Sequence, residues 1–144
     1  MIQKAERIIE AYQKVKPAGC GVIAMDGRAA AGKTTLAEEL AVTLGGAVVH
    51  MDDFFLPGEL RTPERLAAPG GNVHAERFAE EVLPYLRRGE AFRYRRFDCH
   101  RMDYDGWVEI PTVPVIIVEG AYSQHPRFGG YADLTVFCDI APEE

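Results

Sequence analysis

One segment of the sequence has the residue types and the spacing of a phosphate-binding loop. Residues 27–34 read Gly-Arg-Ala-Ala-Ala-Gly-Lys-Thr, which fits the pattern G-x-x-x-x-G-K-S/T. Small residues let the backbone curl so that successive N–H groups point inward, and a helix that starts there favours a polyphosphate. We therefore expect Lys33 to reach the outer phosphates of a nucleotide and the Thr34 hydroxyl to ligate Mg²⁺. The residues expected to contact the phosphates are Gly27, Arg28, Ala29, Ala30, Ala31, Gly32, Lys33, Thr34 and Thr35.

The elements predicted on either side of this loop are those that such a loop needs. Cys20–Met25 is an apolar run without alternation, which is typical of a strand buried on both faces of a parallel sheet. Lys33–Leu44 repeats its apolar residues at helical spacing and ends at Gly45-Gly46. A glycine-rich turn with an incidental lysine is the alternative, and the order of strand, motif and helix argues against it.

Acidic residues follow two further predicted strands. Asp52 and Asp53 come at the end of Ala47–Met51, and Glu119 directly follows Val113–Val118. Ligands bind at the carboxyl ends of parallel strands, so one of these two aspartates could accept the proton of an attacking hydroxyl. Glu119 could support Mg²⁺ there, and Asp52 is a further candidate ligand. The alternatives are a solvated turn or helix cap for the two aspartates and an ordinary loop position for Glu119.

The remaining pattern predicts one α/β domain over residues 1–144. An amphipathic helix over Met1–Lys16 precedes the strand-helix-strand unit, whose crossover is right-handed in nearly all proteins. After a Pro/Gly-rich connection we expect a helix and a projecting hairpin whose loop contains Asp105-Gly106. The ranges are Pro57–Gly71 for the connection, Ala75–Arg88 for the helix, Phe92–Phe97 and Trp107–Ile110 for the hairpin, and Leu134–Ile140 for a last strand.

Composition and charge exclude several classes of protein. Hydrophobic residues make up 47% and charged residues 26%, as in globular domains, and the net charge of -6 argues against nucleic acid as the main partner. Cys20, Cys99 and Cys138 form neither a zinc pattern nor a disulfide framework. No apolar run is long enough for a membrane span, and the first residues do not resemble a secretory signal. We expect a cytoplasmic protein, and whether it forms a homo-oligomer stays open.

The order of three motifs resembles the uridine kinase and phosphoribulokinase group of P-loop kinases, in particular bacterial uridine kinase-like proteins. These motifs are the loop at 27–34, M-D-D-F-F at 51–55 and V-I-I-V-E-G at 115–120, and the resemblance covers nearly all of the chain from Gly19 onward. It implies a three-layer P-loop NTPase sandwich with a five-stranded, mainly parallel sheet. It also implies ATP and Mg²⁺ as cofactors, Asp52 as the base toward a sugar hydroxyl, and Thr34 and Glu119 at the metal.

The same resemblance implies an acceptor pocket built largely by residues 54–111 and closed by the hairpin. His74 stands where relatives carry an Asp that holds ribose hydroxyls, and Phe97-Asp98 resembles a Tyr-Asp pair that covers the base. The acceptor would be a small molecule, a nucleoside or a sugar-like metabolite. The residues expected to bind it are Asp53, Phe55, His74, Phe97, Asp98, Tyr122 and Arg127.

A second function stays open, namely a P-loop module that binds ATP as a regulatory signal or is a catalytically inactive kinase-like protein. The basic residues Arg93, Arg95, Arg96 and Arg101 could bind an anion, although we favour a solvated strand face with packed aromatic residues between them. The histidines His50, His100 and His125 lack metal-like spacing and are expected to be surface residues or structural histidines with satisfied hydrogen bonds.

The last residues, Ala141-Pro142-Glu143-Glu144, resemble the first turn of a helix. In the related kinases a helix, an Arg-bearing lid over the phosphates and a final strand follow. We therefore expect these 144 residues to be a kinase core cut at its C-terminal side, which alone would be weakly active or inactive.

Overall fold

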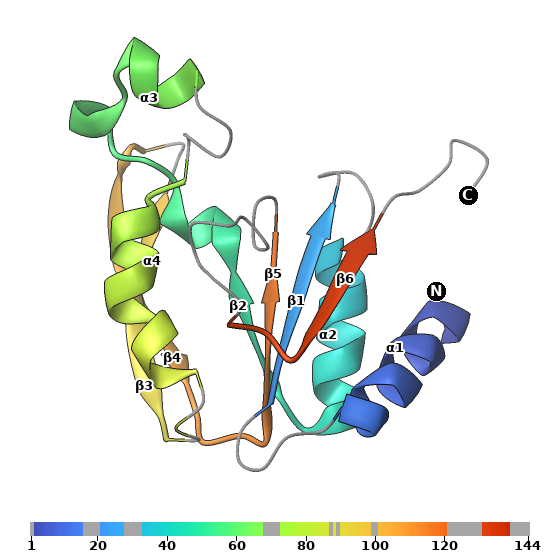
Figure 1. The fold of residues 1–144 in the computed structure, drawn as a ribbon. Helices are drawn as coiled ribbons and strands as arrows, with labels where there is room; N and C mark the ends of the chain where they lie inside the picture. The colour runs from blue at the N-terminus through green and yellow to red at the C-terminus, as the bar shows by residue number, and fades with distance from the viewer. Residues whose placement is uncertain are drawn as a thin grey trace.

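A parallel sheet of four strands forms the centre of the molecule. The computed structural model describes residues 2–15, 21–27, 33–67, 73–86, 88, 90–98, 101–120 and 131–138. In these residues the strand order is β2-β5-β1-β6, and all three neighbouring pairs are parallel (Figure 1). The strands are β1 Gly21–Gly27, β2 Ala47–His50, β5 Val115–Glu119 and β6 Leu134–Cys138. The predicted α/β sandwich with a mainly parallel sheet is confirmed, with four strands in the described part of the chain.

The central strands are buried because side chains point alternately to the two faces of the sheet and both faces are covered. Val22 and Ile116 pack into one apolar cluster, whereas Ile23 and Ile117 pack into a second one on the opposite face. All five residues of β5 are buried. The continuous apolar runs in the sequence follow from this double coverage.

Helices α1 (Ile2–Val15) and α2 (Lys33–Leu44) cover one face of the sheet (Figure 1). Ile8 and Tyr12 of α1 join Leu36 and Leu40 of α2 in a cluster that we call the helix-side core. Both helices occupy the ranges that their apolar periodicity predicts.

The other face is covered by helix α4 and an antiparallel hairpin (Figure 1). Phe54, Phe78 and Tyr94 are its largest fully buried side chains, and we call this cluster the hairpin-side core. The elements between β2 and β5 in the sequence are α3 Pro63–Ala67, α4 Ala75–Glu81, β3 Phe92–Asp98, β4 Asp103–Ile110 and the 3-10 helices Met51–Phe54, Gly58–Leu60 and Leu83–Tyr85. The 3-10 helix Met51–Phe54, called the 51–54 helix below, directly follows β2.

Two predictions for this region are wrong. The helix expected over Ala75–Arg88 ends at Glu81, because Pro84 has no N–H and its ring clashes with the preceding turn of an α-helix. The sequence Asp105-Gly106 is not the hairpin turn but lies inside β4, where two residues oppose Arg96 of β3. Gly106 has a φ of 74° and forms part of a β-bulge, and the register of the hairpin continues past it to the pair Asp98 and Asp103.

No helix in the described residues is long and apolar enough to cross a membrane. The predicted extension of the last strand to Ile140 and the predicted helix start at residues 141–144 lie outside the described part of the chain.

Candidate functional site

The phosphate-loop motif lies between β1 and α2. β1 ends at Gly27, the first residue of the motif, and α2 begins at Lys33. Residues 28–32 and the side chains of Lys33 and Thr34 lie outside the described structure, so their contacts with phosphates stay predictions. Thr35 is exposed and lines a groove between α1 and α2. The backbone order of strand, loop and helix is the one that the motif requires.

Glu119 lies at the carboxyl edge of the sheet, between the end of β1 and the end of β2. In the register of the sheet its Cα is paired with Met25 of β1 on one side and with His50 of β2 on the other. The residue is only 3% exposed. The predicted metal-supporting carboxylate is therefore next to the strand that leads into the phosphate loop.

His50 is the partner that makes burial of this carboxylate tolerable. Its Nδ1 lies 2.5 Å from Glu119 Oε1. This hydrogen bond raises the pKa of His50 above its usual value, and the attraction of nearby carboxylates adds to the effect while burial opposes it. Reasoning from the sequence named no partner for His50, because the strand order that places β2 beside β5 is visible only in the structure.

Gly120 lets the 51–54 helix pass close to the end of β5. Its φ of 136° is a backbone conformation that residues with a side chain rarely adopt, and an added Cβ would lie 2.6 Å from Cβ of Met51. The segment with Asp52 and Asp53 therefore starts against the residue that follows Glu119. The side chain of Asp52 lies outside the described structure, and its role as the base stays a prediction.

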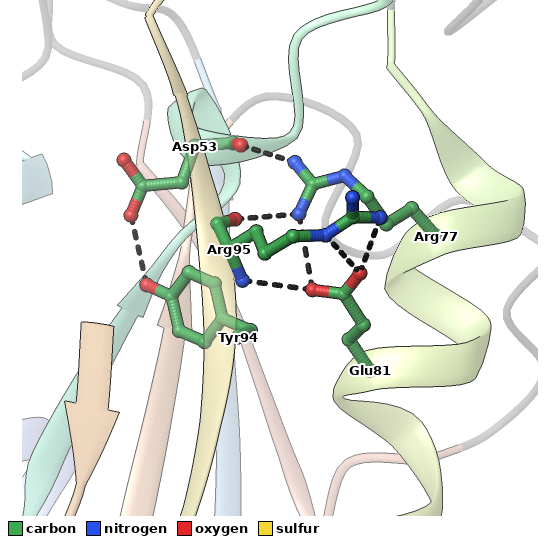
Figure 2. A network of polar contacts seen from close by, with 5 residues as sticks. All are labelled: Asp53, Arg77, Glu81, Tyr94 and Arg95. Atoms are coloured by element: carbon green, nitrogen blue, oxygen red, sulfur yellow. Dashed lines mark hydrogen bonds and ion pairs between the residues drawn. The ribbon is translucent and has the colours of Figure 1, made fainter. Parts of the chain in front are cut away.

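Asp53 faces the hairpin and is held there from two sides (Figure 2). The hydroxyl of Tyr94 donates a hydrogen bond of 2.8 Å to Asp53 Oδ2, and Arg77 Nη2 donates to the backbone carbonyl oxygen of Asp53 at 2.5 Å. Arg96 Nε lies 3.7 Å from Asp53 Oδ1. Burial raises the pKa of Tyr94 strongly, and the Asp53 carboxylate raises it further, so the phenol stays a donor.

Arg77 and Glu81 were missed by reasoning from the sequence. Arg77 is 3% exposed and donates from Nη1 to the carbonyl oxygen of Arg95 at 2.5 Å and to Glu81 Oε1 at 3.2 Å. Burial lowers the pKa of Arg77. The i,i+4 spacing of Arg77 and Glu81 indicates an ion pair on one side of α4, but the same spacing is typical of exposed helix faces and does not by itself predict burial.

Four of the predicted acceptor residues lie near one another. The rings of Phe55 and Phe97 are stacked with centroids 6.4 Å apart. Phe55 forms a bridge with Val73, and the N–H of His74 donates to the carbonyl oxygen of Phe54 at 2.7 Å. The segments that carry Asp53, Phe55, His74 and Phe97 therefore meet beside the 51–54 helix.

The other predicted acceptor residues are not placed in this group. Asp98 Oδ1 accepts a weak hydrogen bond of 3.4 Å from the N–H of Arg101 at the end of the hairpin. Tyr122 and Arg127 lie outside the described structure. His74 itself is partly buried, which lowers its pKa, and its Nδ1 is 3.5 Å from Glu76 Oε1.

The basic residues of the hairpin mostly have local partners. Arg95 pairs with Glu81 at 3.1 Å, Arg101 lies 3.6 Å from Asp105, and the Arg93 guanidinium lies 4.4 Å from the Trp107 ring centroid. Three of the four arginines thus fit the favoured interpretation of a strand face with packed aromatic residues. Arg96 differs, because it extends toward Asp53.

The residues at this edge fit Mg²⁺ and a nucleotide. Among the described residues no group of three or more His, Cys, Asp or Glu side chains could hold a metal by itself. Mg²⁺ at nucleotide sites needs only one or two carboxylates because the phosphates supply further ligands, and Glu119 at the end of β5 is an oxygen donor of this kind. α2, at 12 residues, directs its N-terminal end toward the loop.

Two solved structures share this fold. A possible uridine kinase from Bacillus stearothermophilus has a TM-score of 0.81 and 21% identity, over 96% of this chain and 81% of that one. A protein assigned provisionally as a fructose transport system kinase, from Silicibacter sp. TM1040, has a TM-score of 0.73 and 24% identity, over 95% of this chain and 75% of that one. No model of a known protein family matches the chain. The chain therefore shares the fold of these two structures.

Proposed function

We propose that the protein is an ATP- and Mg²⁺-dependent kinase that transfers the γ-phosphoryl group to a hydroxyl of a nucleoside or sugar-like metabolite. The observation that carries this proposal is the convergence of three strand ends at one edge of the sheet. β1 leads into the phosphate-loop motif, β2 leads into Asp52-Asp53, and β5 between them ends in Glu119. A nucleotide at the loop would thus have carboxylates beside its outer phosphates.

In this proposal Lys33 and the N–H groups of the loop stabilise negative charge on the phosphoryl group while it is transferred. Thr34 and Glu119 would hold Mg²⁺, which when bound neutralises charge on the phosphates. The hydrogen bond from His50 keeps the Glu119 carboxylate in one orientation. Phosphoryl transfer needs positioning more than covalent chemistry, so these fixed contacts carry much of the effect.

Asp52 would accept the proton of the acceptor hydroxyl as the new P–O bond forms. The neighbouring Asp53 is fixed by Tyr94 and Arg77, so the backbone on one side of Asp52 is held in place. The group of Phe55, His74 and Phe97 would lie against the acceptor. Aromatic faces and a partly buried imidazole suit a compact polar molecule with a flat or ring-shaped part.

The test is a transfer assay with γ-labelled ATP against a panel of nucleosides and free sugars. We expect label to appear on at least one acceptor, and Asp52→Asn to lower the transfer rate by about 10²-fold or more while ATP affinity stays within about twofold. Asp105→Asn is the matched control, because Asp105 lies at the bulge of β4 and contacts only the hairpin arginine Arg101 in the described structure. Transfer by the Asp52→Asn variant at the wild-type rate would remove Asp52 from the mechanism.

The same assay separates the kinase from an ATP-binding regulatory module. A module of that kind would bind ATP but would label no acceptor at any concentration. This result would contradict the proposed transfer reaction and leave nucleotide binding as the function.

A further inference from the structure

Arg77 lies at the junction of three segments that are far apart in the sequence (Figure 2). We propose that Arg77 is a positioning residue that ties the 51–54 helix to the hairpin and thereby sets where an acceptor on the hairpin side meets Asp52. This role rests on the proposed function, because it concerns the acceptor half of that site.

The first support is the pair of carbonyl oxygens that Arg77 binds. Nη2 donates to the carbonyl of Asp53 in the 51–54 helix, and Nη1 donates to the carbonyl of Arg95 in β3, both at 2.5 Å. One rigid guanidinium therefore joins the backbone that carries the proposed base to the backbone of the hairpin. A lysine in its place has one point charge and lacks the planar fork needed to reach both carbonyls and a carboxylate.

The second support is the way in which the guanidinium is enclosed. Its carbon atom lies 4.2 Å from the Phe54 ring centroid and 5.3 Å from that of Tyr104, so rings from the 51–54 helix and from β4 flank it. Glu81 receives Arg77 on Oε1 and Arg95 on Oε2, and the N–H of Arg95 also donates to Oε1 at 2.8 Å. With its side chain 2% exposed, Arg77 has little freedom to adopt another arrangement.

The third support is an independent link between the same two segments. The Tyr94 hydroxyl in β3 donates to the Asp53 carboxylate, while Arg77 binds the Asp53 carbonyl. The hairpin thus holds the side chain of the residue next to Asp52, and Arg77 of α4 holds its backbone. Because Arg77 contacts Asp53 and Arg95 through their backbones, it acts on the acceptor through position and not through contact with reacting atoms.

The experiment compares Arg77→Lys with Arg65→Lys as the matched control. Arg65 is also an arginine of this region with two hydrogen bonds to a carboxylate, but its partners are Glu76 and the carbonyl of Val73. For Arg77→Lys we expect kcat/KM for the acceptor to fall by about tenfold to hundredfold, with ATP affinity within about twofold of wild type. For Arg65→Lys we expect both quantities within about twofold of wild type.

Hydrogen exchange of the backbone amides supplies a readout that does not depend on activity. In Arg77→Lys, residues 51–55 and β3 should both exchange faster than in wild type, whereas α1 and α2 should not change. Tyr94→Phe, a milder change that keeps the ring in the core, should speed exchange at residues 51–55 in the same direction.

The outcomes separate this inference from the proposed function. If no acceptor is labelled even by wild type, the kinase proposal fails, and the exchange pattern alone decides whether Arg77 couples the two segments. If acceptor turnover is normal in Arg77→Lys, or if exchange rises only within α4, the positioning role is wrong while the kinase proposal stands.

Discussion

The two faces of the central sheet are covered in different ways. The helix-side core joins α1 and α2 to the sheet through apolar contacts such as those of Ile8, Leu36 and Leu40. The hairpin-side core is also apolar, but a buried arginine and two hydrogen-bonded acidic residues cross it or lie at its border. Both faces therefore pack through apolar side chains, and the face next to the proposed acceptor site adds buried polar contacts between specific residues.

This difference has a physical reason. Apolar packing tolerates exchange of side chains of similar volume, but a buried guanidinium needs acceptors at fixed positions. The polar contacts on the hairpin side therefore specify one arrangement of the 51–54 helix and the hairpin. Such a fixed arrangement of the 51–54 helix and the hairpin suits a region that has to recognise a small molecule.

The largest expected effect comes from truncating Phe54, whose ring takes part in the apolar packing and also contacts the Arg77 guanidinium. Phe54 is fully buried, packs against Phe78 and Tyr94 at ring-centroid distances of 5.2 and 5.0 Å, and lies under Arg77. Phe54→Ala should lower the free energy of unfolding by about 3–5 kcal/mol, and Leu40→Ala in the helix-side core by about 2–5 kcal/mol. Urea unfolding measures both.

The two variants should differ in what else they disturb. Phe54→Ala should speed hydrogen exchange in β3 by more than its loss in the free energy of unfolding explains. Leu40→Ala should speed exchange in β3 only as far as its loss in the free energy of unfolding explains. Equal exchange in β3 for the two variants at matched stability would contradict the contrast between the faces.

The next effect in size concerns the shared carboxylate. Glu81→Gln removes the charge that faces both Arg77 and Arg95, and Glu81 has a side chain that is only 17% exposed. We expect a loss of about 2–3 kcal/mol, because two guanidinium groups would then face each other without a counter-charge. Thermal unfolding of wild type and Glu81→Gln at low and high salt measures this loss. A loss below about 1 kcal/mol, the most that an exposed ion pair usually contributes, would argue against a structural role for the contacts of Glu81 with Arg77 and Arg95.

A smaller effect is expected for Tyr94→Phe. This change deletes one hydrogen bond of 2.8 Å to an ionised carboxylate but keeps the ring, so we expect a loss of about 1–2 kcal/mol. Denaturant unfolding of Tyr94→Phe and of Tyr104→Phe as the control measures the difference. A loss in Tyr104→Phe as large as that in Tyr94→Phe would assign the effect to the hairpin in general and not to Asp53.

The smallest effect is expected at the exposed ion pair of Arg65 and Glu76. The hydrogen bonds from Arg65 lower the pKa of Glu76 to about 2 from its usual 4.5, but the Glu76 side chain is 59% exposed. A lowered pKa stabilises the folded state at pH above about 4.5, and this contribution is lost as the pH falls toward 2. Solvent screening keeps it below about 1 kcal/mol.

The measurement is the pH dependence of unfolding for wild type and Glu76→Gln. Wild type should be slightly more stable at neutral pH, and the two curves should meet near pH 2. A difference that grows as the pH falls would contradict the sign of this linkage.

The sequence predicts the helix side of the fold well. The ranges of α1, α2 and β2 follow from the 3.6-residue repeat in Met1–Lys16 and Lys33–Leu44 and from a short apolar run after Gly45-Gly46. These are local signals, and packing against the sheet reinforces them. The carboxyl-end positions of Asp52 and Glu119 were likewise predictable, because a parallel sheet brings strand ends to one edge.

The hairpin side was predicted less well, because its structure depends on contacts between distant residues. Asp105-Gly106 is a strong turn signal, yet the register of β3 and β4 uses it as a bulge. The importance of Arg77 depends on carbonyl groups of Asp53 and Arg95, which no pattern of residue types reveals. The bond between His50 and Glu119 depends on the order of strands in the sheet.

The most direct test of the central claim is the stoichiometry of the reaction of the wild-type protein. ADP and the phosphorylated acceptor would be quantified together in the presence of Mg²⁺ and each compound of the acceptor panel. The proposed kinase predicts ADP formation that depends on one acceptor and equals the amount of phosphorylated acceptor. ADP formation at the same rate with and without every acceptor, or ATP binding with no turnover, would contradict it.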